Sequence, residues 1–344
     1  MEPQPIATMI RSLGGMPSRR HLLHALTGAG VGLFATRLPA TVAAKKKRRK
    51  KRKQVQRRCD VCRRGCDFRG VQAAIDAAKP GATIRLCPET YRGRINIAKN
   101  LTLIGAGRTR SILDGGGALS PTAVLTVASG ATVTVRALTV KGGNGGDGGG
   151  IDNAGTLTLD GVSVTANSAN QGGGIVNRAG GTLTLTESRV SGNKAGSQGG
   201  GLFVFGGDVT LTRTDVAANE AGPGQSGQGG GIFTLGGAVR LSDSRVTGNE
   251  TGLNGGGLLV NGGAVTLNQS QVTGNKATGT GSEGGGLKII SGAVTLNDTA
   301  VRGNSAAAGG CIYNVKGTVG TDPETVTGNT PDNCAGMAVG NCVN

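Results

Sequence analysis

The chain has little of what a conventional globular core is built from. Its 344 residues include no Trp, two Tyr and five Phe, so aromatic side chains make up only 2% of the sequence. Both histidines, His21 and His24, lie near the N-terminus. Their absence further along excludes Ser-His-Asp and Cys-His nucleophilic systems, and histidine metal sites, from the rest of the chain.

Carboxylates are sparse as well, at 20 in the whole chain. The acids that no regular pattern of opposite charges explains are Asp147, Asp152, Asp160 and Asp208. The remaining residue types leave open carboxylate chemistry of the glycosidase kind, or a Lys or Arg base as in lyases. Since no spacing brings two of these acids together, we predict no catalytic residue and no metal site among them.

Glycine is abundant instead, at 66 residues. It follows no Gly-X-Y period, and strand-forming apolar residues recur between the glycines, so neither collagen nor a disordered linker is predicted. The segment KGGNGGDGGGID, Lys141–Asp152, satisfies a phosphate-loop pattern and most of a calcium-turn pattern. The first pattern recurs by chance at Gly222–Gly227 and the second has no tandem copy, so we expect a structural turn and no cofactor.

The net charge of +17 is concentrated near the N-terminus. Residues 45–58, KKKRRKKRKQVQRR, hold 11 Lys and Arg, and residues 1–44 hold 4 more. Residues 59–344 keep 22 Lys and Arg against 19 Asp and Glu, a net charge of only +3. A groove for nucleic acid is therefore not expected in this part of the chain.

The first 44 residues resemble a twin-arginine export signal. SRRHLL, Ser18–Leu23, precedes an apolar stretch to about Ala35 and small residues at Val42–Ala44. The apolar stretch is too short to span a bilayer stably. We therefore expect residues 1–44 to be cleaved and the protein to be exported to the periplasm, the cell surface or the medium, with no transmembrane span in the mature chain.

Residues 45–58 then begin the mature chain, and two interpretations stay open. A block of like charge repels itself and remains disordered, so the run is either a solvated leader and linker or a tether. As a tether it would bind an anionic cell wall or lipid surface, at about 1 kcal/mol per basic residue.

The seven cysteines lie only at the two ends of the remaining chain. In an exported protein this placement favours disulfides that fasten the ends of the fold. The spacing of the first four is also compatible with a zinc site, and the odd total leaves one thiol unexplained. The disulfide candidates are Cys59, Cys62, Cys66, Cys87, Cys311, Cys334 and Cys342.

Between these ends the sequence repeats. A Gly-Gly-Gly-aliphatic motif, or its variant GGCI, begins at Gly148, Gly172, Gly199, Gly229, Gly255, Gly284 and Gly309, at spacings of 24 to 30 residues. Each copy holds three short segments with strand-like alternation. Three strands in fewer than about 30 residues predict one coil of a right-handed parallel β-helix, in which neighbouring coils pair strand on strand.

Stacked coils turn aligned residues into columns. Leucines such as Leu159 and valines such as Val164 recur at fixed places and are expected to point inward. Each third segment ends in an asparagine, and stacked asparagine amides form hydrogen-bonded ladders. We interpret this column as structural rather than as a ligand site. The predicted ladder is Asn167, Asn193, Asn219, Asn249, Asn275, Asn304 and Asn329.

The residue after each Gly-Gly-Gly-aliphatic motif is expected to point outward. In the middle coils it is apolar, and an exposed apolar stripe tends to mark a binding surface. The alternative is that the longer inserted loops, 220–228 and 276–283, cover it. The predicted ligand-binding residues are Val176, Phe203, Phe233, Leu259 and, further along, Tyr313.

The chain before the repeats differs in pattern. Val71–Ala78, VQAAIDAA, has helical spacing and is followed by Pro80 and Gly81, so we predict a short helix that caps the solenoid. The expected organisation is a cap with the first coil at 59–107, β-helix repeats at 108–330, and a second cysteine-containing cap at 331–344. The fold class is all-β, a single-stranded right-handed β-helix of about 8–10 coils.

Two segments resemble known families. Val71–Gly107 resembles the opening of pectin-lyase-like β-helix proteins, and the Gly-Gly-Gly-aliphatic repeats with their V-x-x-N ends resemble those of polymorphic outer-membrane proteins. The resemblance implies the fold, whereas the catalytic motifs of pectin methylesterases and pectate lyases are not found. We expect a binding or structural module for a polysaccharide or cell-surface ligand, and a polysaccharide lyase or glycosidase is the alternative.

Overall fold

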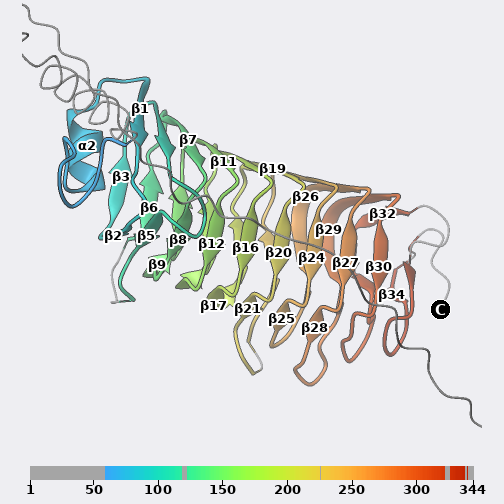
Figure 1. Ribbon diagram of the computed structural model, residues 1–344. Helices are drawn as coiled ribbons and strands as arrows, with labels where there is room; N and C mark the ends of the chain where they lie inside the picture. Colours follow the sequence, from blue (N-terminus) through green and yellow to red (C-terminus); the bar gives the residue numbers. More distant parts are fainter. Residues whose placement is uncertain (1–58, 118–121, 225, 322–325, 338, 340–344) are drawn as a thin grey trace, which may run out of the picture. The chain divides into compact units, whose positions relative to one another are not determined.

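The described part of the chain is a parallel β-helix. The computed structural model describes residues 59–117, 122–224, 226–321, 326–337 and 339, all within Lys53–Asn344. About nine turns stack along one axis (Figure 1), so the predicted fold class is confirmed. Among these residues no helix is long and apolar enough to cross a membrane. The predicted export signal and polybasic run, 1–44 and 45–58, lie outside the described residues.

Each coil contributes strands to parallel columns. The first column contains β3 (Ile95–Ile97), β6 (Leu125–Val127), β10 (Ile151–Asn153), β14 (Ile175–Asn177), β18 (Leu202–Val204), β22 (Ile232–Thr234), β31 (Ile312–Asn314) and β34 (Cys334–Gly336). The second contains β1 (Ala82–Arg85), β4 (Leu101–Ile104), β7 (Thr132–Arg136), β11 (Thr156–Asp160), β15 (Thr182–Thr186), β19 (Asp208–Thr212), β23 (Ala238–Ser242) and β32 (Thr318–Thr321). Two long strands, β26 (Leu258–Asn268) and β29 (Leu287–Asn297), run through both columns and join them in one sheet.

Two further sheets complete the coils. The ten-stranded sheet contains β2 (Thr90–Arg92), β5 (Ile112–Asp114), β8 (Thr139–Lys141), β12 (Ser163–Thr165), β16 (Arg189–Ser191), β20 (Asp215–Ala217), β24 (Arg245–Thr247), β27 (Gln271–Thr273), β30 (Ala300–Arg302) and β33 (Val326–Thr327). The six-stranded sheet contains β9 (Asn144–Asp147), β13 (Ser168–Gln171), β17 (Lys194–Gln198), β21 (Glu220–Ala221), β25 (Glu250–Thr251) and β28 (Lys276–Ala277).

The core is a stack of aliphatic side chains. Leu159 pairs with Leu185 and Val164 with Val190 in successive coils, and all four are buried as predicted. At the N-terminal end, α2 (Val71–Ala77) packs Val71, Ala74 and Ile75 against this core. Figure 1 shows α2 at the open end of the solenoid, where it covers a surface that would otherwise be exposed.

The asparagine ladder is present in the structure. Asn167 Nδ2 donates to Asn193 Oδ1 at 3.0 Å, and the same oxygen accepts the backbone N–H of Asn167. Each amide also donates to a carbonyl of the preceding coil, as Asn249 Nδ2 does to Val216 O. The arrangement repeats to Asn329, so the ladder satisfies polar groups at a buried corner of every coil.

A second ladder, made of hydroxyl groups, was not predicted. The hydroxyl oxygen of Ser188 accepts the backbone N–H of Val162 in the preceding coil, and Thr214 accepts that of Ser188. The pattern continues through the next three coils. Because this column contains both Ser and Thr, no single residue type repeats along it, although both residues supply the same hydroxyl acceptor.

The glycine motifs mark places where backbone approaches backbone. At the first glycine of a motif, Gly199 has φ +62°, a conformation that costs glycine little. At the third, Gly201, an added Cβ would lie 2.7 Å from Gly231 O in the next coil and 2.8 Å from the ladder amide of Asn219. These turns therefore have a structural role, and the same holds for Gly150 in the opening motif.

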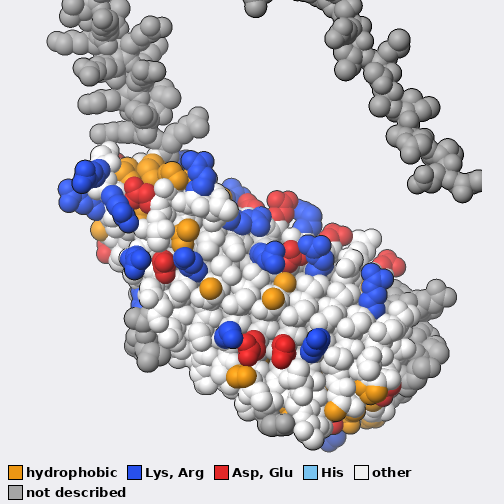
Figure 2. Space-filling model, turned by 60° about the horizontal axis from the view of Figure 1, so that its bottom comes forward, with side chains coloured by type: hydrophobic (Ala, Val, Ile, Leu, Met, Phe, Trp, Pro, Cys, Tyr) orange, Lys and Arg blue, Asp and Glu red, His pale blue; other side chains and the backbone are white. Residues whose placement is uncertain are grey.

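Charged side chains pair between neighbouring coils on the outside. Arg213 lies 3.1 Å from Glu187, and Arg245 contacts Asp215 at 2.7 Å with two hydrogen bonds. Lys194 contacts Glu220 at 2.7 Å. Figure 2 shows Lys and Arg next to Asp and Glu in several places on the face that it displays. Exposed pairs of this kind contribute about 0.2–1 kcal/mol each.

Candidate functional site

The predicted apolar stripe lies on the outer face of the first column, but it is buried. Val176, Phe203, Phe233 and Leu259 are at most 5% exposed and form a hydrophobic cluster separate from the main core. The interpretation of an open, solvent-facing stripe is therefore wrong. Of the predicted ligand-binding residues, only Tyr313 is partly exposed.

Packing within the column explains the burial. The rings of Phe203 and Phe233 lie 5.4 Å apart in adjacent coils, and Ile290 packs against the cluster. The first glycine of each motif also lies against the cluster, since a Cβ on Gly229 would be 2.8 Å from Phe233 Cβ. Phe205, which follows the end of β18, is 46% accessible and stacks on Phe203. The cluster itself stays buried, and Phe205 is the exposed ring that packs against it.

Polar residues close both ends of this column. At one end Arg178 donates two hydrogen bonds to Asp152, at 2.6 and 2.8 Å, and lies 4.0 Å from Asp147. These carboxylates, with the hydrogen bond to Asp152 as the main cause, raise the pKa of Arg178. Two of the four acids that the sequence left unexplained are therefore ion-paired, and Asp160 pairs with Arg136 at 3.0 Å.

At the other end Lys288, Glu283 and Tyr313 form a small cluster. Lys288 is 8% exposed, contacts the Glu283 carboxylate, and places its Nζ 5.6 Å from the centre of the Tyr313 ring. The negative charge of Glu283 raises the pKa of Tyr313. The phenol therefore stays protonated at neutral pH, and the lysine is ion-paired with the carboxylate. Neither group is arranged as a general base.

A basic cleft in the N-terminal cap was not predicted. Its volume is about 310 Å³, and it lies between the start of α2 and the strands β2 and β3. Four arginines line it, with Glu89 as the one lining carboxylate. Arg94 donates to Thr122 O, and no ion pair joins the other three to a carboxylate of the described chain. The lining arginines are Arg63, Arg69, Arg92 and Arg94.

Tyr91 in β2 lines the cleft, and its hydroxyl reaches the backbone next to the cap cysteines. Its hydroxyl donates to Val61 O at 2.8 Å and lies 3.0 Å from Cys87 O. Burial, assisted by the charge of Glu89, raises the pKa of Tyr91 to about 12. The signal for this cleft was available in the sequence, because residues 59–107 hold eight Lys and Arg against four Asp and Glu, a net charge of +4.

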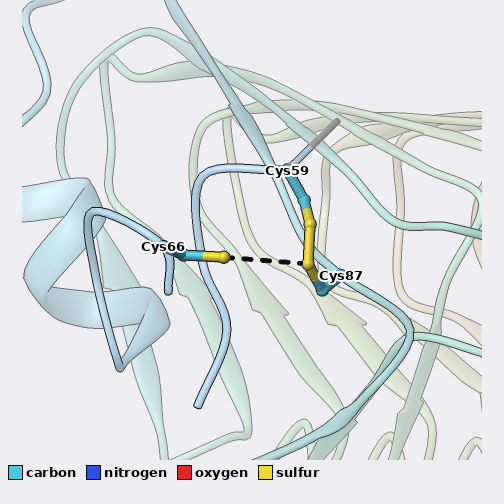
Figure 3. A group of neighbouring side chains, drawn as sticks. All are labelled: Cys59, Cys66 and Cys87. Carbon is cyan, nitrogen blue, oxygen red and sulfur yellow. Dashed lines mark hydrogen bonds between the residues drawn. A yellow bond between two sulfur atoms is a disulfide. The ribbon is translucent and has the colours of Figure 1, made fainter. Parts of the chain in front are cut away.

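The cysteines of the cap form two disulfides: Cys59–Cys87, which Figure 3 shows, and Cys62–Cys66. Cys334 is also disulfide-bonded, and Cys342 lies outside the described residues. Among the disulfide candidates Cys311 is instead a free, buried thiol whose pKa burial raises strongly, and it is a thiol of the kind that the odd total left unexplained. Cys311 replaces the third glycine of its motif and packs into the core.

Comparisons with known proteins add a fold likeness. No family model and no curated protein matches the chain. Among solved structures, the crystal structure of pectate lyase Pel9A is similar, with 18% sequence identity, 78% of this chain and 73% of that chain covered, and a TM-score of 0.43. The assignment of a parallel β-helix rests on the strand pairing itself, and the resemblance to polymorphic outer-membrane repeats stays a prediction.

Proposed function

We propose that the protein is an exported, non-catalytic β-helix that binds an acidic polymer, such as a uronate polysaccharide, outside the cell or at its surface. The observation that carries this proposal is the basic cleft of the cap. Guanidinium groups bind carboxylates through two parallel hydrogen bonds, and Arg63, Arg69 and Arg92 form no ion pair with a carboxylate of the described chain. A cleft of about 310 Å³ accommodates a sugar-sized group.

The coils have fewer side chains that are free to bind a ligand. Several of their outward carboxylates pair with arginines and lysines of neighbouring coils, their ladder asparagines bond to one another, and their apolar stripe is buried. The described residues contain no histidine. Of the four acids considered for catalysis, three are ion-paired with arginines, and Asp208 accepts the backbone N–H of Ala238. The stacked coils therefore serve as a rigid support, and the cap is the part available for binding.

The polybasic run supports the same ligand class. Residues 45–58 immediately precede the cap in sequence and carry 11 basic residues, so export would present both to an anionic wall or lipid surface. Deletion of residues 45–58 is expected to move cell-associated protein into the medium. Equal fractionation of the full and shortened chains would remove the tether from the proposal while leaving the cleft.

Binding can be tested with matched charge variants. Arg69→Ala/Arg92→Ala is expected to weaken binding to polygalacturonate about tenfold or more, if each contact contributes about 1 kcal/mol. Arg240→Ala/Arg302→Ala removes the same charge from exposed sites on the coils and is expected to leave the affinity within about twofold. Equal losses in both variants would mean that net charge, not the cleft, determines binding.

The same polymer tests the enzyme alternative. Polygalacturonate incubated with the protein, with and without calcium, is expected to yield neither unsaturated products nor new reducing ends. Sustained turnover that persists in the Arg69→Ala/Arg92→Ala variant would contradict a non-catalytic function and place chemistry elsewhere on the chain.

A further inference from the structure

The cysteines of the cap come close enough together to share one ion. The Sγ atoms of Cys59, Cys66 and Cys87 all lie within 4.8 Å of one another, and Cys62 is covalently bonded to Cys66. Figure 3 shows Cys66 pointing toward the Cys59–Cys87 pair. Three of the four residues precede α2, and Cys87 follows β1, so the fold brings two separate segments to this point.

The distance between sulfur atoms of the two different disulfides matches the spacing of sulfur ligands around a zinc ion. Cys66 Sγ lies 3.8 Å from Cys87 Sγ. In a tetrahedral zinc–thiolate site with Zn–S bonds of about 2.3 Å, neighbouring sulfurs lie about 3.8 Å apart. The separation between these segments therefore already suits a metal site, and the C-x2-C-x3-C spacing of Cys59, Cys62 and Cys66 is of the kind that zinc sites use.

The segments do not depend on the disulfides alone to stay together. Asp60 N donates to Arg85 O at 2.7 Å, and Cys87 N donates to Val61 O at 3.1 Å. Cys62 N donates to Phe68 O at 3.0 Å. These backbone hydrogen bonds, with the one that the Tyr91 hydroxyl donates to Val61 O, hold the cysteine positions after the S–S bonds are cut.

We propose that the reduced cap binds one Zn²⁺ through Cys59, Cys62, Cys66 and Cys87 in place of the two disulfides. Each disulfide accepts two electrons and two protons and gives two thiols: an added phosphine supplies the electrons and becomes its oxide while water supplies the oxygen and the protons, or an added thiol supplies both and becomes a disulfide. The four thiol protons are then released as the thiolates coordinate zinc. Cap closure therefore persists in reducing and in oxidising surroundings, by metal in one case and by disulfides in the other.

Charge around the cluster favours this site. Four thiolates and one Zn²⁺ carry a net charge of −2, which nearby cations stabilise. Arg63 and Arg64 lie between Cys62 and Cys66 in the sequence, and Arg85 lies two residues before Cys87. The acids of these two segments are Asp60, Asp67 and Glu89. Asp60 and Glu89 each accept a backbone N–H, from Arg85 and Arg63 respectively, and Asp67 is exposed to solvent.

Cobalt titration tests the site in the full chain. After anaerobic reduction with a phosphine, Co²⁺ is expected to produce the intense visible bands of a tetrahedral thiolate complex, and one equivalent of Zn²⁺ should abolish them. The oxidised chain is expected to show no such bands. Cys66→Ser and Cys87→Ser should lose the signal, whereas Cys311→Ser and Cys334→Ser, which alter cysteines outside the cap, should keep it.

A structural measurement on the unaltered chain guards against variants that fail to fold. X-ray absorption of the reduced, zinc-loaded protein is expected to show four sulfur ligands at about 2.3 Å. A shell made mainly of oxygen or nitrogen, no bound zinc after reduction, or an undiminished cobalt signal in Cys66→Ser and Cys87→Ser would each overturn the proposal. Binding of acidic polymer to the oxidised chain is a separate outcome, because it depends on the arginines.

Discussion

The cap and the coils handle polar side chains in opposite ways. From residue 108 onward, 14 Lys and Arg face 15 Asp and Glu, a net charge of −1, whereas residues 59–107 carry +4. In the coils many polar residues have a partner one coil away, since the same type or its complement recurs there. The cap has no repeating neighbour, so three of the four arginines of its cleft lack carboxylate partners in the described chain, and its cysteines pair with one another. We therefore expect the repeating coils to stabilise the fold and the non-repeating cap to carry the binding function.

The largest effect is expected from breaking a column. Asn249 is fully buried, donates to Val216 O and to Asn275 Oδ1, and accepts two hydrogen bonds from Asn219. Asn249→Leu leaves several of these groups buried without partners, at about 1–3 kcal/mol each. We expect the free energy of unfolding in urea to fall by about 4 kcal/mol.

The exposed pair Asn297–Asn268 supplies the control. Asn297 Nδ2 donates to Asn268 Oδ1 at 2.8 Å on the surface, so Asn297→Ala is expected to change the free energy of unfolding by less than about 0.5 kcal/mol. Similar losses in both variants would mean that the buried ladder is no more important than any surface amide.

The sequence predicts well those columns in which the same residue type recurs in every coil. The asparagines and the inward leucines recur as single letters, so their columns can be aligned from the sequence alone. The hydroxyl ladder mixes serine and threonine, as in Ser188, Thr214 and Ser244, so an alignment by residue identity does not detect its acceptors. The cap cleft could not be predicted in detail, because it joins α2 to β2 and β3 through contacts that occur once.

The apolar stripe shows where alternation misleads. An outward direction was correctly inferred for Phe203 and Phe233, but direction alone does not determine exposure. Neighbours above and below in the column, and glycine backbone alongside, cover both rings. Period-two alternation reports which face a residue occupies and nothing about what else packs on that face.

Because the stripe is buried, we expect substitutions in it to lower the free energy of unfolding. In an open stripe they would affect only ligand binding. Phe233→Ser removes a ring that is 2% exposed and packed on Phe203, so we expect a loss of about 3 kcal/mol in the free energy of unfolding. Phe205→Ser, at a position 46% exposed, is the control and should cost less than about 1 kcal/mol. A Phe233→Ser chain as stable as the parent would mean that the column is open to solvent.

Glycine substitutions sharpen the comparison within the coils. Gly201→Ala places a methyl group 2.7 Å from Gly231 O and 2.8 Å from Asn219 Nδ2. Because both neighbours belong to the ladder corner, we expect a loss of about 2 kcal/mol, measured by urea unfolding. Gly161→Asn is the control: it has φ +61° and open space around it, and Glu187 and Arg213 adopt similar backbone conformations in the next coils.

Tyrosine ionisation compares the cap directly with the coils and has the smallest expected effect. Burial raises the pKa of Tyr91 in the folded cap to about 12, against about 10 in an unfolded chain. Below pH 10 both states are protonated and the contribution of Tyr91 to stability is complete. Between pH 10 and 12 only the unfolded state ionises, so stability falls, by at most about 1.4 kcal/mol per pH unit.

Tyr91→Phe is therefore expected to flatten the loss of stability above pH 10, measured as the difference in unfolding free energy between parent and variant at pH 9 and pH 11. The only other tyrosine, Tyr313, also has a raised pKa, but its cause is the charge of Glu283 at a partly exposed site, where solvent and salt screen the interaction. Tyr313→Phe should flatten the profile less, and that smaller effect should shrink in high salt. If Tyr313→Phe has the larger effect, the cap is not the more tightly buried of the two environments.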